Sequence, residues 1–339
     1  MTEKPFLTKL KKSIKRALPE GVNLSDALTD TLSLSKESVY RRLRGETPFN
    51  LDELMHLRSV YNISLDSLSS SSRGILVDFR PIFNSHENFI DYFKNIIERF
   101  KRINGHPHAI TYNAAENLPF FRQLGYANLA AFKVFFWRRS ILNHAEFQNK
   151  TFAVQEETTE LDELCSEIYR LYCVGDSVEI WTRQTLDGTL NQIEYYADCG
   201  LIDHSRSLIA VYKDLMQLIT DLRDHARQSC KIFPNGKNGG NFTLYHCELS
   251  LDNNSVLLYT DRPSYVAMGF NSFNSLQSND EKLLNESWKW FEAMIQKSIM
   301  VSGISERSRY EFYRENVDKI MKSATARLGD DIQKIIPEV

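Results

Sequence analysis

The segment Ser35–Arg44, which reads SKESVYRRLR, constrains the fold of this chain more than any other. Ser35 is a good helix N-cap, because its side-chain oxygen can accept a backbone N–H of the first turn. Val39 and Leu43 are four residues apart, so they fall on one face of the predicted helix, while the charged residues and Tyr40 point elsewhere. A helix this short gains little stability from its own propensity and needs a packed partner.

The preceding segment supplies that partner. Ser25–Leu32 carries Leu28 and Leu32 at the same four-residue spacing, and Ser33-Leu34 makes a tight connection to the next helix. The second of the two helices carries arginine, lysine and tyrosine on its outward surface. Two short helices joined by a turn of three to four residues, the second with basic residues and tyrosine on its outward surface, predict a helix-turn-helix.

The run SLSKESVYRRLRGETPFNLDELMHLRSVYNISLDSL resembles the repressor/Cro-like helix-turn-helix family, the xenobiotic-response-element type of bacterial regulator. The resemblance covers about 50 residues near the N-terminus and implies a DNA-binding module. Two positions depart from the family pattern. The turn glycine common in the family is Ser33 here, and the aliphatic residue expected three positions after Val39 is Arg42, which shifts the buried face to Leu43.

A further helix and a domain boundary follow. Asn50 can cap this helix with Glu53 three residues later, close to a capping box. A last short turn, Ser64 to Leu68, brings the total to about five helices in 68 residues. The polar tract SSSSRG that comes next has no side chain able to anchor a core, so it predicts a flexible linker. The predicted division is a helical domain, a linker and a larger domain, at 1–68, 69–75 and 76–339.

Composition and charge fit a folded protein with one basic end. At 339 residues, with 42% hydrophobic and 12% aromatic content, the chain can build substantial cores. Residues 1–73 hold twelve Lys and Arg against nine Asp and Glu, so the net charge of −3 leaves an acidic remainder. A basic module on an acidic body suits contact with phosphates, although the lysines near the N-terminus equally suit the solvated face of a first helix.

Membrane and secretory segments are not expected. No stretch approaches the roughly 20 uncharged apolar residues that a membrane span requires, and the lysines near the N-terminus are scattered instead of preceding an apolar block. The five cysteines are widely spaced without a C-x-x-C pair, which favours reduced thiols over disulfides or a zinc site. We expect a cytoplasmic protein that associates with the nucleoid when it is bound to DNA.

The remainder of the chain predicts a larger mixed α/β, helix-rich domain, which makes the fold class α+β. Apolar spacing predicts helices at 89–100, 129–142, 161–172, 190–199, 207–226, 280–299 and 305–328. Strands are predicted at 109–112, 178–181, 242–249, 256–260 and 265–270. Turn residues separate the last three strands, so they predict an antiparallel meander near the C-terminal end.

The larger domain shows no recognisable catalytic motif. We find no Gly-rich phosphate loop, G-x-S-x-G elbow or H-E-x-x-H, and His106-Pro107-His108 without a third ligand is more typical of a surface loop than of a metal site. We therefore expect no enzyme, no catalytic residue, no metal and no cofactor. An enzymatic site that only the fold could bring together is the alternative.

A polar loop after the last expected strand is the first place to look for an effector. Asn271, Ser272 and Asn274 lie there, and strand ends beside a helix N-terminus often form small-molecule sites. An ordinary strand-to-helix connection is the competing interpretation. The late strands, followed by the W-x-W-F helix with Trp288 and Trp290, are similar to the body of a group of helix-turn-helix regulators from Bacteroidetes-type bacteria.

The sequence predicts a sequence-specific DNA-binding transcriptional regulator whose second motif helix enters the major groove of double-stranded DNA. Arginine can bond guanine bidentately and Glu37 can accept from cytosine, while Ser25 and nearby lysines position the phosphates. The expected DNA-binding residues are Ser25, Ser35, Lys36, Glu37, Tyr40, Arg41 and Arg44. The alternative is a protein-docking or RNA-associated module attached to a scaffold or enzyme.

Strong specificity requires more surface than one module offers, so we expect a homodimer on half-sites about 34 Å apart. The long terminal helices are the candidates for the dimer contact. Their apolar residues in question are Ile299, Ile304, Tyr310, Phe312, Tyr313, Val317, Ile320 and Met321. An effector, either a small molecule or a protein, is a further expected partner.

Overall fold

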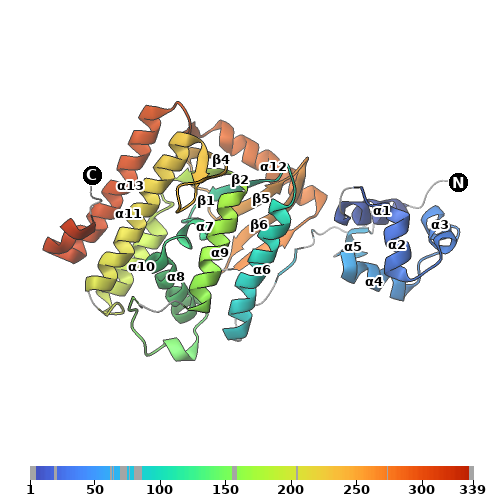
Figure 1. Ribbon diagram of the computed structural model, residues 1–339, viewed down its shortest axis with the longest axis horizontal. Helices are drawn as coiled ribbons and strands as arrows, with labels where there is room; N and C mark the ends of the chain where they lie inside the picture. The colour runs from blue at the N-terminus through green and yellow to red at the C-terminus, as the bar shows by residue number, and fades with distance from the viewer. Residues whose placement is uncertain are drawn as a thin grey trace. The chain divides into compact units, whose positions relative to one another are not determined.

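The protein divides into two compact units, Met1–Val77 and Asp78–Val339. The computed structural model describes residues 5–18, 21–61, 63, 65–68, 75, 77–79, 86–154, 159–203, 205–272 and 274–335. Figure 1 traces the chain through both units in colours from blue to red. The expected linker lies outside the described residues, apart from Ile75.

In its described residues the first unit is all-helical, with the expected five helices. They are α1 (Pro5–Ala17), α2 (Leu24–Leu32), α3 (Lys36–Arg44), α4 (Leu51–Tyr61) and α5 (Leu65–Leu68). One small core holds them together, and Leu28, Val39 and Leu57 at its centre are 0% exposed. The α4 start has the expected capping box: the Asn50 N–H donates to Glu53 Oε2 at 3.0 Å, and the Glu53 N–H donates to Asn50 Oδ1 at 2.7 Å.

The second unit is a mixed α/β unit rich in helices, which confirms the α+β class. Its helices are α6 (His86–Asn104), α7 (Phe120–Gln123), α8 (Ala127–Phe136), α9 (Glu160–Val174), α10 (Asp187–Asp198), α11 (Ser205–Gln228), α12 (Glu281–Gln296) and α13 (Glu306–Leu328). A π-helical turn at Trp137–Ile141 extends α8, and short 3-10 helices lie at Ala145–Phe147 and Gly329–Ile335. The expected helices are therefore present, with ends shifted by a few residues.

One mixed sheet organises this unit. Its strands are β1 (Ile110–Ala115), β2 (Asp176–Thr182), β3 (Cys230–Ile232), β4 (Asn238–Cys247), β5 (Ser255–Tyr259), β6 (Pro263–Phe270), β7 (Asn274–Ser278) and β8 (Ile299–Met300). The strand order is β3-β4-β2-β1-β5-β6-β7, with β8 paired to β4. The neighbours β4, β2 and β1 are parallel, and the remaining pairs are antiparallel.

The antiparallel meander exists, but its membership differs from the prediction. The observed meander is β5-β6-β7, whereas β4, predicted as its first strand, pairs in parallel with β2. Phe242 and Leu244 of β4 pack into one hydrophobic cluster while Cys247 packs into another. A strand that buries residues on both faces belongs in the centre of a sheet that is covered on both sides. The alternation of apolar and polar residues therefore located β4 in the sequence but did not identify the strand beside it.

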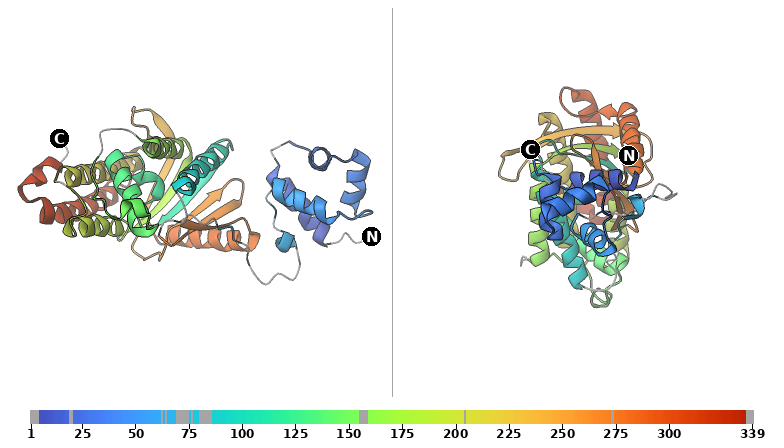
Figure 2. Two further views of the ribbon diagram at one scale, coloured as in Figure 1. Left: turned by 90° about the horizontal axis from the view of Figure 1, so that it is seen from below. Right: turned by 90° about the vertical axis from the view of Figure 1, so that its right-hand side faces the viewer.

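Helices cover both faces of this sheet. The α12 helix packs on one face, where its Phe291 joins Ala114 and Ile180 in a cluster, and it lies along the strands in Figure 2. The opposite face carries the larger cluster, to which Trp181 of β2 and Leu215 of α11 belong. Figure 1 shows α6 beside α9 and α11 beside α13 among the helices of this unit.

The terminal helix α13 is a core helix, which corrects the expected dimer contact. Phe312 is 4% and Ile320 0% exposed, and Tyr313, Val317 and Met321 pack against the same intramolecular cluster. These five side chains stabilise their own unit. Of the expected contact residues, Ile299, Ile304 and Tyr310 are exposed.

None of the described helices combines the length and apolar character needed to cross a bilayer.

Candidate functional site

The turn between α2 and α3 is built on a serine in a left-handed conformation. Ser33 has φ 52° and ψ 38°, and its N–H and that of Leu34 both donate to the carbonyl of Thr29. A side chain in this region costs roughly 1–2 kcal/mol relative to glycine, so the local hydrogen bonds must hold it. Ser35 then caps α3 as expected, because its Oγ accepts the Ser38 N–H at 3.3 Å.

The α3 helix separates a buried face from an exposed one. Val39 is 0% and Leu43 9% exposed. On the opposite face, the side chains of Lys36, Arg41 and Arg44 are 58%, 57% and 58% exposed. The remaining members of the expected set on this helix, Glu37 and Tyr40, are also exposed. The structure therefore brings these five predicted residues onto one surface of the module.

Among the described residues, the cations of this surface pair with exposed carboxylates. Lys36 Nζ lies 2.7 Å from Asp26 Oδ1, and Arg44 Nε lies 2.6 Å from Glu46 Oε1. Arg41 Nε is 3.7 Å from the same Glu46 carboxylate. The hydrogen bond from Arg44 lowers the pKa of Glu46. Exposed pairs of this kind contribute about 0–1 kcal/mol, so a phosphate or a guanine can replace the carboxylate at small cost.

Arg42 has a different role from its neighbours. Its Nε and Nη2 donate to the two carboxylate oxygens of Glu53 at 3.0 and 2.8 Å, and the side chains are only 15% and 12% exposed. This bidentate pair ties α3 to α4. The sequence marked Arg42 only as a departure from the family pattern and did not reveal its partner, because Glu53 was fully explained as a capping residue.

Ser25 is the predicted residue that the structure places differently. It is 4% exposed, and its Oγ lies 2.7 Å from Asn23 Oδ1 and 3.2 Å from the Tyr40 hydroxyl. The side chain therefore points into the junction of α2 and α3, where it positions Tyr40. Asn23 occupies the exposed N-cap of α2, accepting the Ser25 N–H at 2.9 Å. The buried Ser25 hydroxyl does not present the phosphate contact that its sequence position predicted.

A five-helix module with a capped second motif helix and a basic exposed face defines the class of helix-turn-helix DNA-binding domains. Residues 6–76 of the chain match the BetR domain, a small N-terminal helix-turn-helix-like DNA-binding domain of regulators. The matched range runs from α1 to beyond α5. Comparisons of the chain with curated proteins and with solved structures gave no match.

A second candidate site is a cavity of about 620 Å³ within the C-terminal unit. Asn271, Ser272 and Asn274, the predicted effector residues, all line it. Asn271 and Ser272 are exposed and form the β6–β7 turn with φ of 51° and 63°. Asn274 is 7% exposed and begins β7, so the expected polar loop is in part a strand.

The lining of this cavity includes a lysine and two glutamines that the sequence did not identify as site residues. Lys133 of α8 is 5% exposed, and its Nζ donates to Gln192 Oε1 at 2.5 Å and to Thr189 Oγ1 at 3.4 Å. Burial lowers the pKa of Lys133 to about 7. Gln123, which ends α7, lines the same cavity at 4% exposure. The only sequence signal was a single lysine in the apolar run from Leu129 to Trp137.

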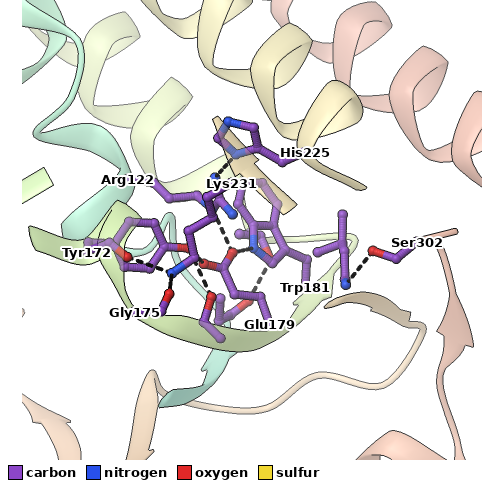
Figure 3. A network of polar contacts seen from close by, with 12 residues as sticks. Arg122, Tyr172, Gly175, Glu179, Trp181, His225, Lys231 and Ser302 are labelled. Atoms are coloured by element: carbon purple, nitrogen blue, oxygen red, sulfur yellow. Dashed lines mark hydrogen bonds and ion pairs between the residues drawn. The ribbon is translucent and has the colours of Figure 1, made fainter. Parts of the chain in front are cut away.

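A buried polar network lies between the sheet and the helices of this unit. The Glu179 carboxylate on β2 accepts from Arg122 Nε at 2.7 Å, from Trp181 Nε1 at 2.8 Å and from the Tyr172 hydroxyl. Figure 3 shows these groups converging on Glu179. Arg122 and Glu179 are 1% and 0% exposed, and the Glu179 charge raises the pKa of Arg122 against the opposing effect of burial. The network joins β2 to α7 and α9.

Two further basic residues complete the network. Lys231 of β3 donates to the carbonyls of Tyr172 and Gly175, both at 2.6 Å, and burial lowers its pKa to about 7. His225 of α11 lies 3.5 Å from Arg122 Nη1, and burial together with that guanidinium lowers the pKa of His225 to about 3. Across the residues that the structure covers, no three His, Cys, Asp or Glu gather as a metal site.

Proposed function

We propose that this protein is a sequence-specific transcriptional regulator in which α3 lies in the major groove of double-stranded DNA. The observation that carries the proposal is the exposed face of α3, where Lys36, Arg41 and Arg44 form exchangeable surface ion pairs. The BetR match over the same module supports a DNA-binding role. The resemblance of the sequence to the repressor/Cro-like pattern, with Ser33 in the place of the turn glycine, supports the same role.

In this mechanism, the arginines read base edges and the lysine contacts phosphate. Arg41 and Arg44 offer planar guanidinium groups suited to guanine O6 and N7, and Glu37 can accept from the amino group of cytosine. Lys36 neutralises phosphate and adds salt-dependent affinity. Arg42 is committed to Glu53 and sets the orientation of α3 relative to α4.

We further propose that the regulator acts as a dimer and that its C-terminal unit senses an effector instead of catalysing a reaction. The exposed side chains of Ile299, Ile304 and Tyr310 are available for contact with a second copy. The cavity beside Asn271 supports the sensing role. The Glu179 carboxylate supports the non-enzymatic role. It is 0% exposed and already bonded to protein groups, as expected of a structural carboxylate and not of a catalytic one. Such a regulator works in the cytoplasm.

The test is selection of bound duplexes from a randomised library by the full-length protein and by its Arg41→Ala variant. We expect an enriched inverted repeat, and a loss of about 1–3 kcal/mol in Arg41→Ala at the bases that Arg41 reads. Arg307→Ala is the matched control, because Arg307 is also an exposed, ion-paired arginine but lies on α13. An unchanged base preference in Arg41→Ala would refute its role, and no enriched sequence would favour a docking module.

A further inference from the structure

Lys133 is a buried amine without a carboxylate partner among the described residues. Its Nζ donates to two neutral side-chain oxygens, those of Gln192 and Thr189, and lies 5.7 and 5.8 Å from the ring centroids of Phe136 and Trp137. An ammonium group has three N–H donors, so two oxygen acceptors leave the third without an oxygen partner among the described residues. Within the part of the chain that the structure describes, no carboxylate forms an ion pair with it, whereas the equally buried Arg122 is paired with Glu179. Burying an uncompensated charge is unfavourable, and an anion in the cavity would relieve it.

The start of α10 lines the cavity together with Lys133. Gly188 and Thr189, in the first turn of α10, line the cavity. The N-cap residue Leu186 provides no side-chain acceptor for the first backbone N–H groups. The first turn carries its own carboxylate, Asp187, which pairs with Lys319 at 2.8 Å, and the Thr189 N–H donates to the Leu186 carbonyl. The amine of Lys133 is therefore the group that favours an anion in this part of the cavity.

A second buried group in the cavity lacks a partner among the described residues. Within that part of the chain, Gln123 Oε1 has no hydrogen-bond partner, although the residue is only 4% exposed, while its Nε2 lies 3.5 Å from the Leu118 carbonyl. An unpaired buried acceptor is unfavourable until a donor reaches it. Gln123 lines the same cavity as Lys133. The cavity thus presents a cation and a hydrogen-bond acceptor for a ligand to satisfy.

The walls between these polar groups are aromatic. Phe120 and Trp137 lie stacked with ring centroids 5.3 Å apart, and Tyr92 meets Phe120 edge-on at 6.4 Å. All three line the cavity, which at about 620 Å³ is within the size range of small-molecule sites. The acidic residues among its lining, Asp91 and Asp252, are exposed, unlike the buried Lys133. A flat apolar ligand fits such walls, provided that its charge is negative where it meets the lysine.

We propose that this cavity binds a small aromatic carboxylate. The carboxylate pairs with Lys133 beside the start of α10, the ring lies against Phe120 and Trp137, and a hydroxyl or N–H substituent donates to Gln123. That this ligand is the effector of the regulator rests on the proposed function. The binding itself does not.

The route from the cavity toward the other unit begins at β7. Gln277 of β7 lines the cavity and exchanges two backbone hydrogen bonds with Asp78, at 2.6 and 3.0 Å. Phe79 meets Phe270, another lining residue, edge-on at 5.5 Å. Asp78 and Phe79 are the first residues of the C-terminal unit. A strand that lines the cavity is therefore bonded directly to the first residues of the C-terminal unit.

The experiment is isothermal titration calorimetry of the full-length protein, without DNA, against hydroxylated benzoates, cinnamates and indole carboxylates, each paired with its neutral amide. We expect at least one acid to bind at least tenfold more tightly than its amide. The Lys133→Met variant should abolish that difference. Lys213→Met, at an exposed lysine of α11, is the control and should preserve it.

The acid-to-amide comparison in the wild-type protein keeps the proposal falsifiable even if Lys133→Met fails to fold. Equal affinities for acid and amide, or no binding by any acid, would overturn it, as would an unchanged acid preference in a folded Lys133→Met protein. The acid that binds best is then added to the DNA selection. Acid binding without any DNA sequence preference would refute the proposed function and support the ligand site. A DNA sequence preference without acid binding would support the proposed function and refute the ligand site.

Discussion

The basic side chains of the α3 surface and two buried basic side chains of the C-terminal unit occupy opposite environments. On α3, Lys36 and Arg41 are more than half exposed and face carboxylates that are themselves exposed. In the C-terminal unit, Arg122 and Lys133 are buried, the first paired with Glu179 and the second bonded to neutral groups. An exposed charge can exchange its partner at little cost, whereas a buried charge depends on a partner held in place. The environment of a cation, more than its position in a basic stretch, therefore decides what it can bind.

The largest effect that follows from this contrast is at Glu179. Glu179→Gln should lower the free energy of unfolding of the C-terminal unit by about 3–5 kcal/mol, because it leaves the Arg122 charge buried and uncompensated. The measurement is denaturant unfolding followed by tryptophan fluorescence, since all four tryptophans lie in this unit. Glu311→Gln, in an exposed pair with Arg307, is the control and should change little. If Glu179→Gln lowered the free energy of unfolding by less than about 1 kcal/mol, the contrast between buried and exposed charges would be contradicted.

The next effect is a pH dependence due to Lys133. Its pKa is lowered to about 7 in the folded protein, and the unfolded chain holds that proton to about pH 10.4. Between these values the unfolded state binds more protons, so stability rises with pH by about 1.4 kcal/mol per unit from this group. Lys231 has the same lowered pKa and adds its own slope. Stability curves from pH 7.5 to 9.5 should therefore be shallower in Lys133→Met, and parallel curves would refute the assignment.

A smaller effect separates two neighbours on α3. Arg42→Met should destabilise the packing of α3 on α4 by about 1–3 kcal/mol, because it removes two charge-assisted hydrogen bonds to Glu53. Amide hydrogen exchange should report faster exchange in α3. Arg41→Met removes only an exposed pair and should leave exchange nearly unchanged. Equal exchange in the two variants would show that burial does not distinguish these arginines.

The smallest expected effect on stability is at Lys36. Lys36→Gln breaks an exposed pair with Asp26, so the free energy of unfolding should change by less than about 0.5 kcal/mol. DNA binding should respond more clearly: the slope of log affinity against log salt concentration should become shallower by about 1. Lys213→Gln should leave that slope as it is. An identical salt slope in Lys36→Gln would exclude a phosphate contact by this residue.

Local patterns predicted the helices well, because apolar spacing reports the buried face of each one. The predicted helix at 207–226 is observed as Ser205–Gln228, and that at 305–328 as Glu306–Leu328. Strand partners were harder to predict. The strand β4 was correctly located but was assigned to the wrong neighbour, since its position depends on helices packed on both faces and not on its own alternation.

The two candidate sites also differ in how well the sequence predicted them. The α3 surface is formed by residues of a single nine-residue helix, so their spacing in the sequence placed Lys36, Arg41 and Arg44 together. The cavity brings together Asn274 and Lys133, which are far apart in the sequence. The β6–β7 turn offered a polar cluster to recognise, whereas Lys133 was a single charge in an apolar helix. Only the fold shows that its partners are neutral.

The strand order of the C-terminal unit also has a consequence during protein synthesis. The Ile110 position of β1 pairs with Tyr259 of β5, so the centre of the sheet cannot close until most of the chain has left the ribosome. The helices of the first unit make their contacts within its own short length. Local contacts form fast and domains fold as they emerge. A nascent chain therefore completes its basic module first, and a ribosome that stalls midway carries a folded helix-turn-helix ahead of an unfinished sheet.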